Sequence, residues 1–175
     1  MKSILIPVAK DVQDQEFFYP YYRIQEEGWN LDVAAENLDV VKGKFGIPIK
    51  PNITFVDMWD YAQHQKYDAI IIPGGWAPES MRMDRFVIET VKMMNADGKL
   101  IAAICHGPQV MISARIIKDR YVTGYVGIWD DICNAGGCYT KDGSYVQDKN
   151  FITSSHYKYN PQWMKAIVEW LKNRT

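Results

Sequence analysis

The chain has 175 residues and a formal net charge of −1, from 20 Lys+Arg against 21 Asp+Glu. Its 47% hydrophobic and 23% charged residues are typical of a folded protein and exclude wholesale disorder. The near-neutral charge excludes a protein that binds nucleic acid or anionic lipid mainly through its net charge, because such phosphate binding requires a surplus of basic residues. The length fits one globular domain, and we expect it to span residues 1–175.

Cysteine usage and hydropathy set further limits. Cys105, Cys133 and Cys138 are odd in number and form no CxxC pair, and the chain has only three histidines. We therefore expect neither a disulfide framework nor a metal site. The N-terminus lacks the apolar run of a signal peptide, and no segment approaches the roughly 20 apolar residues of a membrane span. These features predict a cytoplasmic protein with reduced thiols, one of them present for its reactivity.

Short apolar runs alternate with longer amphipathic ones along the chain. The predicted elements are, in order, a strand at 3–8, a helix at 13–27, a strand at 31–35, a hairpin at 40–50, a helix near 58–64, a strand at 69–73, a helix at 84–96, a strand at 100–104, a helix at 107–117, two short strands at 138–140 and 145–147, a strand at 150–153 and a helix at 160–173. Asp84 is a suitable helix N-cap, and Asp130 and Asp131 are typical of a helix start. This alternation predicts a parallel sheet between two layers of helices.

The segment LIAAICHGP places Cys105 directly after an apolar strand and just before a helix. The small residues Ala102, Ala103 and Gly107 around it are typical of a nucleophile elbow, a tight turn that lifts a nucleophile above the sheet. The N-terminus of the following helix would stabilise a thiolate and lower its pKa. The alternative is a buried structural cysteine, the usual fate of a free thiol.

A second motif, PGG, ends the preceding core strand at Gly74 and Gly75. In open α/β sheets the chemistry lies beyond the carboxyl ends of the strands, where this motif and Cys105 are both placed. A Gly-Gly pair exposes backbone N–H groups with no Cβ in the way. We therefore expect the N–H groups of Gly75 and His106 to form an oxyanion hole.

The segments IIIPGGWAPE, AICHGPQVMISA and YVGIWDDICNAGG resemble the ThiJ/PfpI superfamily, most closely its PfpI-type intracellular protease branch. The resemblance covers essentially the whole chain. It implies a flavodoxin-like, three-layer α/β sandwich, related to class I glutamine amidotransferases, and no cofactor. It places the nucleophile on Cys105 and the carboxyl that hydrogen-bonds the thiol on Glu16. Glu16 would then need a raised pKa to stay protonated; the alternative is an exposed helix acid.

The same resemblance implies a Cys-His-Glu arrangement in which His106 pairs with a glutamate of a neighbouring subunit. That acid matches Glu79, so the site would be complete only in a homo-oligomer, a dimer or a hexamer. Tyr125 matches a family tyrosine near the site and would donate its hydroxyl to substrate. The alternatives are an ordinary helix acid for Glu79 and a core or interface aromatic for Tyr125.

The chain also departs from the family pattern. His156 stands where relatives commonly carry arginine, so a group that titrates near neutrality replaces a permanent cation. Gln13 replaces a further acid of the first helix, and Trp76 adds a large side chain at the pocket rim. We count Trp76, His156 and Tyr125 as substrate-binding residues. Cys133 and Cys138 are interpreted as structural or incidental.

Together these features predict a Cys-dependent enzyme that acts on carbonyl compounds. The resemblance points to conversion of 2-oxoaldehydes such as methylglyoxal to hydroxy acids (glyoxalase III, with the related deglycase activity) and to peptide hydrolysis. Both begin with thiolate attack on a carbonyl, and a pocket narrowed by Trp76 favours the small aldehyde. The alternative from another class is a stress-response redox sensor or chaperone in which Cys105 is oxidised. A glutamine-amidotransferase-like subunit is disfavoured, because His156 is not part of the His-x-Glu pair expected of that class.

Overall fold

The computed structural model describes residues 1–141 and 143–174 and is built around one large sheet. The sheet has seven strands in the order β10-β11-β7-β6-β1-β2-β5. Their bounds are Ser3–Pro7 (β1), Asn30–Ala35 (β2), Ile53–Thr54 (β5), Ala69–Ile72 (β6), Leu100–Ile104 (β7), Val146–Asp148 (β10) and Phe151–Ser154 (β11). All neighbouring strands are parallel except β10 and β11. The predicted, mostly parallel sheet is confirmed.

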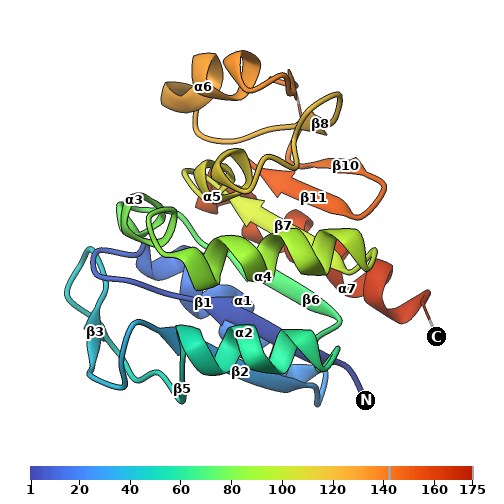
Figure 1. Cartoon of the computed structure of the whole chain (residues 1–175). Coiled ribbons are helices and arrows are strands. Elements are labelled where there is room, and N and C mark those ends of the chain that lie inside the picture. The colour runs from blue at the N-terminus through green and yellow to red at the C-terminus, as the bar shows by residue number, and fades with distance from the viewer. Residues whose placement is uncertain (142, 175) are drawn as a thin grey trace.

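Helices cover both faces of this sheet (Figure 1). Helices α1 (Asp14–Glu26) and α7 (Asn160–Lys172) contact each other on one face, and α2 (Phe55–Gln63) and α4 (Arg85–Ala96) contact each other on the opposite face. The shorter α3 (Ala77–Met81) and α5 (Pro108–Ser113) pack together. The α/β sandwich predicted from the alternating pattern is therefore present.

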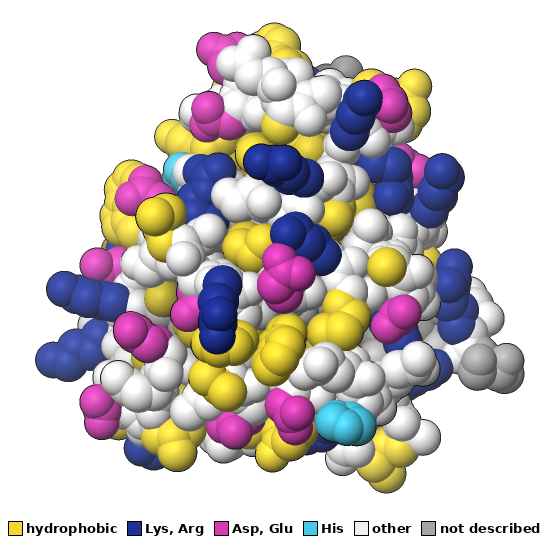
Figure 2. Space-filling model, in the orientation of Figure 1, with side chains coloured by type: hydrophobic (Ala, Val, Ile, Leu, Met, Phe, Trp, Pro, Cys, Tyr) yellow, Lys and Arg dark blue, Asp and Glu magenta, His cyan; other side chains and the backbone are white. Residues whose placement is uncertain are grey.

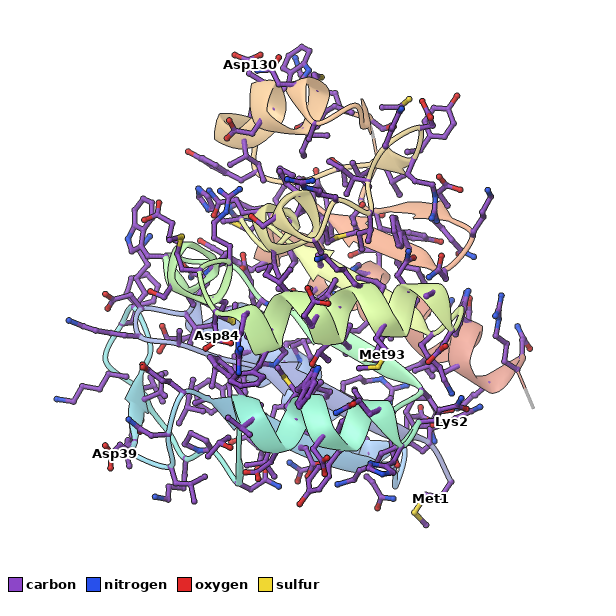
Figure 3. All side chains as sticks on the ribbon, viewed as in Figure 1. Met1, Lys2, Asp39, Asp84, Met93 and Asp130 are labelled. Carbon is purple, nitrogen blue, oxygen red and sulfur yellow. The ribbon has the colours of Figure 1, made fainter. Side chains whose placement is uncertain are left out.

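Two small ribbons flank the main sheet. Strands β3 (Val41–Lys42) and β4 (Pro48–Ile49) form the antiparallel hairpin that the sequence predicts. Strands β8 (Tyr121–Val122) and β9 (Cys138–Tyr139) pair in parallel beside α6 (Trp129–Asn134). Helix α6 carries Asp130 and Asp131 in its first turn, as expected of helix-start acids. Asp130 lies at the outer end of the molecule, away from the main sheet (Figure 3).

Local hydrogen bonds explain where two helices begin. Asp84 caps α4, since its Oδ1 accepts the N–H groups of Phe86 and Val87 at 2.7 and 3.2 Å (Figure 3). Helix α2 begins earlier than predicted, because Thr54 and Asp57 form a reciprocal capping box. The N–H of Thr54 donates to Asp57 Oδ2 at 2.9 Å, and the N–H of Asp57 donates to Thr54 Oγ1 at 3.2 Å.

Helix α5 ends earlier than predicted. The sequence predicts a helix over 107–117, but α5 ends at Ser113, and Arg115 has a φ of 58°. A left-handed residue stops helical propagation, and the turn redirects the chain towards β8.

The central strands are fully buried. Every residue of β6 and β7 is inaccessible, as expected for parallel strands covered on both faces. Trp163 of α7 is also inaccessible, and its Nε1 donates to the Ile152 carbonyl of β11 at 3.0 Å. Figure 2 shows charged side chains of both signs mixed with apolar ones on the face that carries α2 and α4. Within the described ranges, no helix is long and apolar enough to cross a bilayer.

Candidate active site

Cys105 lies in a strained turn between β7 and α5. Its φ of 58° is in the left-handed region, which non-glycine residues rarely adopt. Hydrogen bonds hold the turn on both sides: the N–H of Cys105 donates to the Ser154 carbonyl at 2.9 Å, and its carbonyl accepts from the N–H of Tyr125 at 2.7 Å. A Cβ at Gly107 would collide with the Ile72 carbonyl, so only glycine fits there. These hydrogen bonds and this close packing hold Cys105 in its strained conformation, and such constraints are what allow backbone strain to persist at functional sites.

The Gly-Gly turn after β6 lies directly beside this cysteine. A Cβ on Gly74 would lie 2.7 Å from Cys105 Cβ and 2.6 Å from Glu16 Oε2, so the close approach requires glycine. Gly75 has a φ of +73°. Its N–H and that of His106 favour the thiolate of Cys105 and oppose the rise of its pKa. These are the two backbone donors predicted to form an oxyanion hole.

Glu16 is completely buried in the first turns of α1, beneath the thiol. Its Oε2 accepts the N–H of Gly74 at 2.8 Å, whereas its Oε1 has no hydrogen-bond partner among the described residues. Burial raises the pKa of Glu16 to about 7, although the hydrogen bonds from Gly74 and Cys105 and the charge of Lys44 oppose this rise. The carboxyl therefore keeps its proton to near-neutral pH.

Glu16 and Cys105 titrate as a coupled pair. Burial, followed by the negative charge of Glu16, raises the pKa of the Cys105 thiol to about 12. The lowered thiol pKa that the sequence predicts is therefore wrong, because these two effects outweigh the backbone N–H groups that favour the thiolate. The pair therefore resists carrying two negative charges, and adjacent groups of this kind share one proton between them. When the proton lies on Glu16, the Coulombic opposition to the thiolate disappears. The reactive form is then a thiolate beside a carboxylic acid.

His106 is half-buried and turned towards the sulfur. Its Nδ1 lies 3.5 Å from Cys105 Sγ, and its ring stacks on Tyr125 with centroids 4.6 Å apart. Burial and the charge of Lys44 lower the pKa of His106, whereas the charge of Glu79 raises it; the net direction is downward. Glu79 itself is exposed on α3 of the same chain. The imidazole is therefore neutral at pH 7 and able to accept a proton.

One pocket of about 330 Å³ opens over the nucleophile. It is lined by Gln13, Glu16, Lys44, Phe45, Gly75, Trp76, Cys105, His106, Tyr125, His156 and Tyr157. Every residue that the sequence places at the site lines it except Glu79, which acts on His106 only through its charge. His156 has a lowered pKa because of burial and the charge of Lys158, so it is neutral at pH 7, unlike the arginine it replaces.

Sequence reasoning missed three pocket residues: Lys44, Phe45 and Tyr157. Lys44 and Phe45 come from the turn between β3 and β4, which the sequence presents only as a hairpin. The sequence gives no direct signal for them, because the turn is anchored by Asp14, an acid whose burial appears only in the fold. Its carboxylate accepts the N–H groups of Phe45 and Ile47 at 2.8 and 3.3 Å, which holds this turn against the pocket.

Known proteins are similar to this chain in sequence and in fold. The "Deglycase PfpI" of Pyrococcus furiosus is 39% identical over 170 residues, which cover 97% of this chain and 99% of the relative. The "Putative cysteine protease YraA" of Bacillus subtilis is 36% identical over 158 residues, covering 87% of this chain and 88% of the relative.

A solved structure from Anabaena variabilis, titled as a two-domain protein with DJ-1/ThiJ/PfpI-like and ferritin-like domains, superposes with a TM-score of 0.93 at 32% identity. The match covers 98% of this chain and 48% of that one. The family model described as "DJ-1/PfpI family" matches residues 2–170. Together with the elbow and its buried glutamate, these matches show that the chain belongs to the DJ-1/PfpI family.

Proposed function

We propose that this protein is a cofactor-free, Cys-dependent enzyme that converts small 2-oxoaldehydes to 2-hydroxy acids, with the related deglycase activity on adducts of such aldehydes. The observation that carries the proposal is the position of Cys105. Its sulfur faces two backbone N–H donors and a buried Glu16 that is protonated near neutrality. Relatives named deglycase and cysteine protease support Cys-dependent chemistry on carbonyl groups.

The geometry provides a role for each group in this reaction. The Cys105 thiolate adds to the aldehyde carbon while Glu16 gives its proton to the carbonyl oxygen, which forms a hemithioacetal. The N–H groups of Gly75 and His106 stabilise the negative charge that develops on that oxygen. Glu16 or His106 then moves the remaining C–H proton to the neighbouring carbon, and the hydroxyl proton of the hemithioacetal passes to the neighbouring carbonyl oxygen, which yields a 2-hydroxyacyl thioester. Water hydrolyses the thioester and releases the hydroxy acid and the free thiol.

The shape of the pocket favours small substrates over peptides. Trp76 is 49% exposed at the rim, and its ring centroid lies 5.5 Å from that of His106. Tyr125 and His156 also line this pocket of about 330 Å³, which leaves little room for a peptide to extend on both sides of a scissile bond. Peptide hydrolysis by the same nucleophile is therefore the second candidate.

A parallel substrate panel tests the assignment. Wild type and Cys105→Ala are assayed with methylglyoxal, a fluorogenic peptide and casein, and lactate is measured for the aldehyde. We expect lactate formation that depends on Cys105 and exceeds peptide turnover. Peptidase activity without methylglyoxal turnover would reverse the order of the two candidates. No turnover at all, with selective addition of two oxygens to Cys105 by peroxide seen by intact mass, would instead establish the redox-sensor alternative.

We also propose that the active form is a homo-oligomer in which Glu79 of one subunit orients His106 of another. Glu79→Gln is expected to lower kcat/KM by roughly 10- to 100-fold, as for loss of a charged orienting group. Glu79→Gln and Cys105→Ala subunits, mixed and reassembled, are expected to recover activity, because only a cross-subunit site then contains both groups. Confirmed mixed oligomers without recovered activity, or an active wild-type monomer, would contradict this arrangement.

A further inference from the structure

Lys44 provides a permanent cation at the mouth of the pocket. It lines the pocket together with Cys105, and its Nζ lies 5.2 Å from the Trp76 ring centroid. Among the described residues it forms no ion pair within 4.0 Å, whereas Lys66 pairs with Asp32 at 2.7 Å. No other lysine or arginine lines the described pocket. The charge therefore faces the space above the nucleophile.

The backbone fixes the turn from which Lys44 extends. The N–H of Lys44 donates to the Val12 carbonyl at 2.8 Å, and the N–H of the next residue, Phe45, donates to Asp14 at 2.8 Å. Asp14 is only 3% exposed, and Gly43 packs so closely on its carboxylate that no side chain fits there. The turn thus holds the lysine over the pocket although the side chain is exposed.

The acids nearby form no ion pair with Lys44 among the described residues, and Asp14 accepts backbone N–H groups of the turn instead. Glu16 is buried below the thiol and keeps its proton to near pH 7. Glu79 does not line the pocket, and its charge acts on His106. Three aromatic side chains, Phe45, Trp76 and Tyr157, line the same pocket as Lys44. A cation beside aromatic walls suits a ligand with an apolar or planar part and an anionic end.

We propose that Lys44 is a specificity-determining residue that selects carbonyl substrates carrying an anionic group, a carboxylate or a phosphate. The proposal rests on the proposed function, because the same Cys105 attacks the carbonyl. It narrows the substrate class from 2-oxoaldehydes in general to anionic ones. A competing role for Lys44, stabilising the thiolate alone, would act equally on neutral and anionic reagents.

Paired alkylating agents separate these two roles without requiring turnover. Iodoacetate and iodoacetamide have nearly the same size, and in both the Cys105 thiolate forms an S–C bond as iodide leaves; only iodoacetate carries a negative charge. The rate constants at Cys105 are measured by peptide mass mapping. We expect Lys44→Met to lower the iodoacetate-to-iodoacetamide rate ratio by about three- to fivefold, as for loss of one nearby charge in a partly solvated site.

Two variants serve as controls. Lys42→Met removes an exposed lysine two residues away that does not line this pocket, and the ratio should be unchanged. Lys44→Arg keeps the positive charge, so its iodoacetate-to-iodoacetamide rate ratio should stay close to that of wild type. Equal loss of both rates in Lys44→Met, or an unchanged ratio, would overturn the proposal.

A second experiment measures turnover and compares kcat/KM for 4-carboxyphenylglyoxal with kcat/KM for phenylglyoxal. We expect wild type to have the higher kcat/KM for the carboxylate and Lys44→Met to lose this preference, mainly through KM. A wild type without such a preference would overturn the proposal. If neither aldehyde is turned over, the proposed function fails, while the alkylation ratio still decides whether Lys44 recognises anions.

Discussion

Replacing Cys105 with alanine or glycine is expected to abolish turnover of every carbonyl substrate, and the glycine variant is expected to be the more stable of the two. Both variants lack the sulfur that forms the covalent intermediate, so we expect kcat to fall by at least about 10⁴-fold, the scale seen when a nucleophile is removed. Alanine keeps a Cβ at a φ of 58°, whereas glycine adopts this angle freely.

The left-handed conformation costs a non-glycine residue roughly 1–2 kcal/mol. Cys105→Gly should therefore unfold at higher denaturant concentration than Cys105→Ala, by about 1 kcal/mol once the greater flexibility of the unfolded glycine chain is counted. Urea unfolding at one pH measures the difference. Equal midpoints for the two variants would show that the turn stores no strain.

Glu16→Gln is expected to lower kcat by roughly 10²- to 10⁴-fold, because an amide retains the hydrogen bond from the Gly74 N–H but cannot exchange a proton with substrate. The fold should be kept, since glutamine has nearly the same shape and places a carbonyl oxygen where Oε2 accepts at 2.8 Å. Glu26→Gln, which removes an exposed acid of the same helix that does not line the pocket, is the comparison for a general loss of charge. Retention of full activity by Glu16→Gln would exclude this carboxyl from proton transfer.

The same substitution changes how stability depends on pH. The pKa of Glu16 rises from 4.5 in a model peptide to about 7 in the fold, so the folded state binds the proton more tightly than the unfolded state does. Its contribution is complete below pH 4.5 and is lost as the pH rises through 7, by about 3 kcal/mol in all. Glu16→Gln should lack this loss. Unfolding free energies at pH 5 and pH 8.5 for both proteins measure it.

Much of the fold follows from the sequence where apolar runs are long. The run Leu100–Ile104 reads as a buried strand and is one, and the alternation with amphipathic helices indicates the layers. Short elements were missed for a physical reason. Strand β5 has two residues and α3 has five, too few for a periodic pattern, and their positions depend on packing against the rest of the chain.

The residues of the candidate site also fall into those that the sequence predicts and those that it does not. Cys105 and the Gly-Gly pair lie next to predictable strands, so their proximity follows from the adjacency of β6 and β7. The position of Glu16 came from family resemblance, since helix periodicity alone does not distinguish a buried acid from an exposed one. Lys44 was missed because its place over the pocket depends on Asp14, a contact between residues about 30 positions apart in sequence.

The pairing of β6 with β7 has a consequence for how this scaffold can change its chemistry. Parallel register sets Ile72 opposite Ala103, and the thiol and its backbone donors follow directly from these strand ends. The rim residues Lys44, Trp76 and His156 come from connecting segments instead. Substitutions there can therefore alter which carbonyl compound enters without moving the sulfur. New specificities can accumulate around a nucleophile whose own geometry is inherited unchanged.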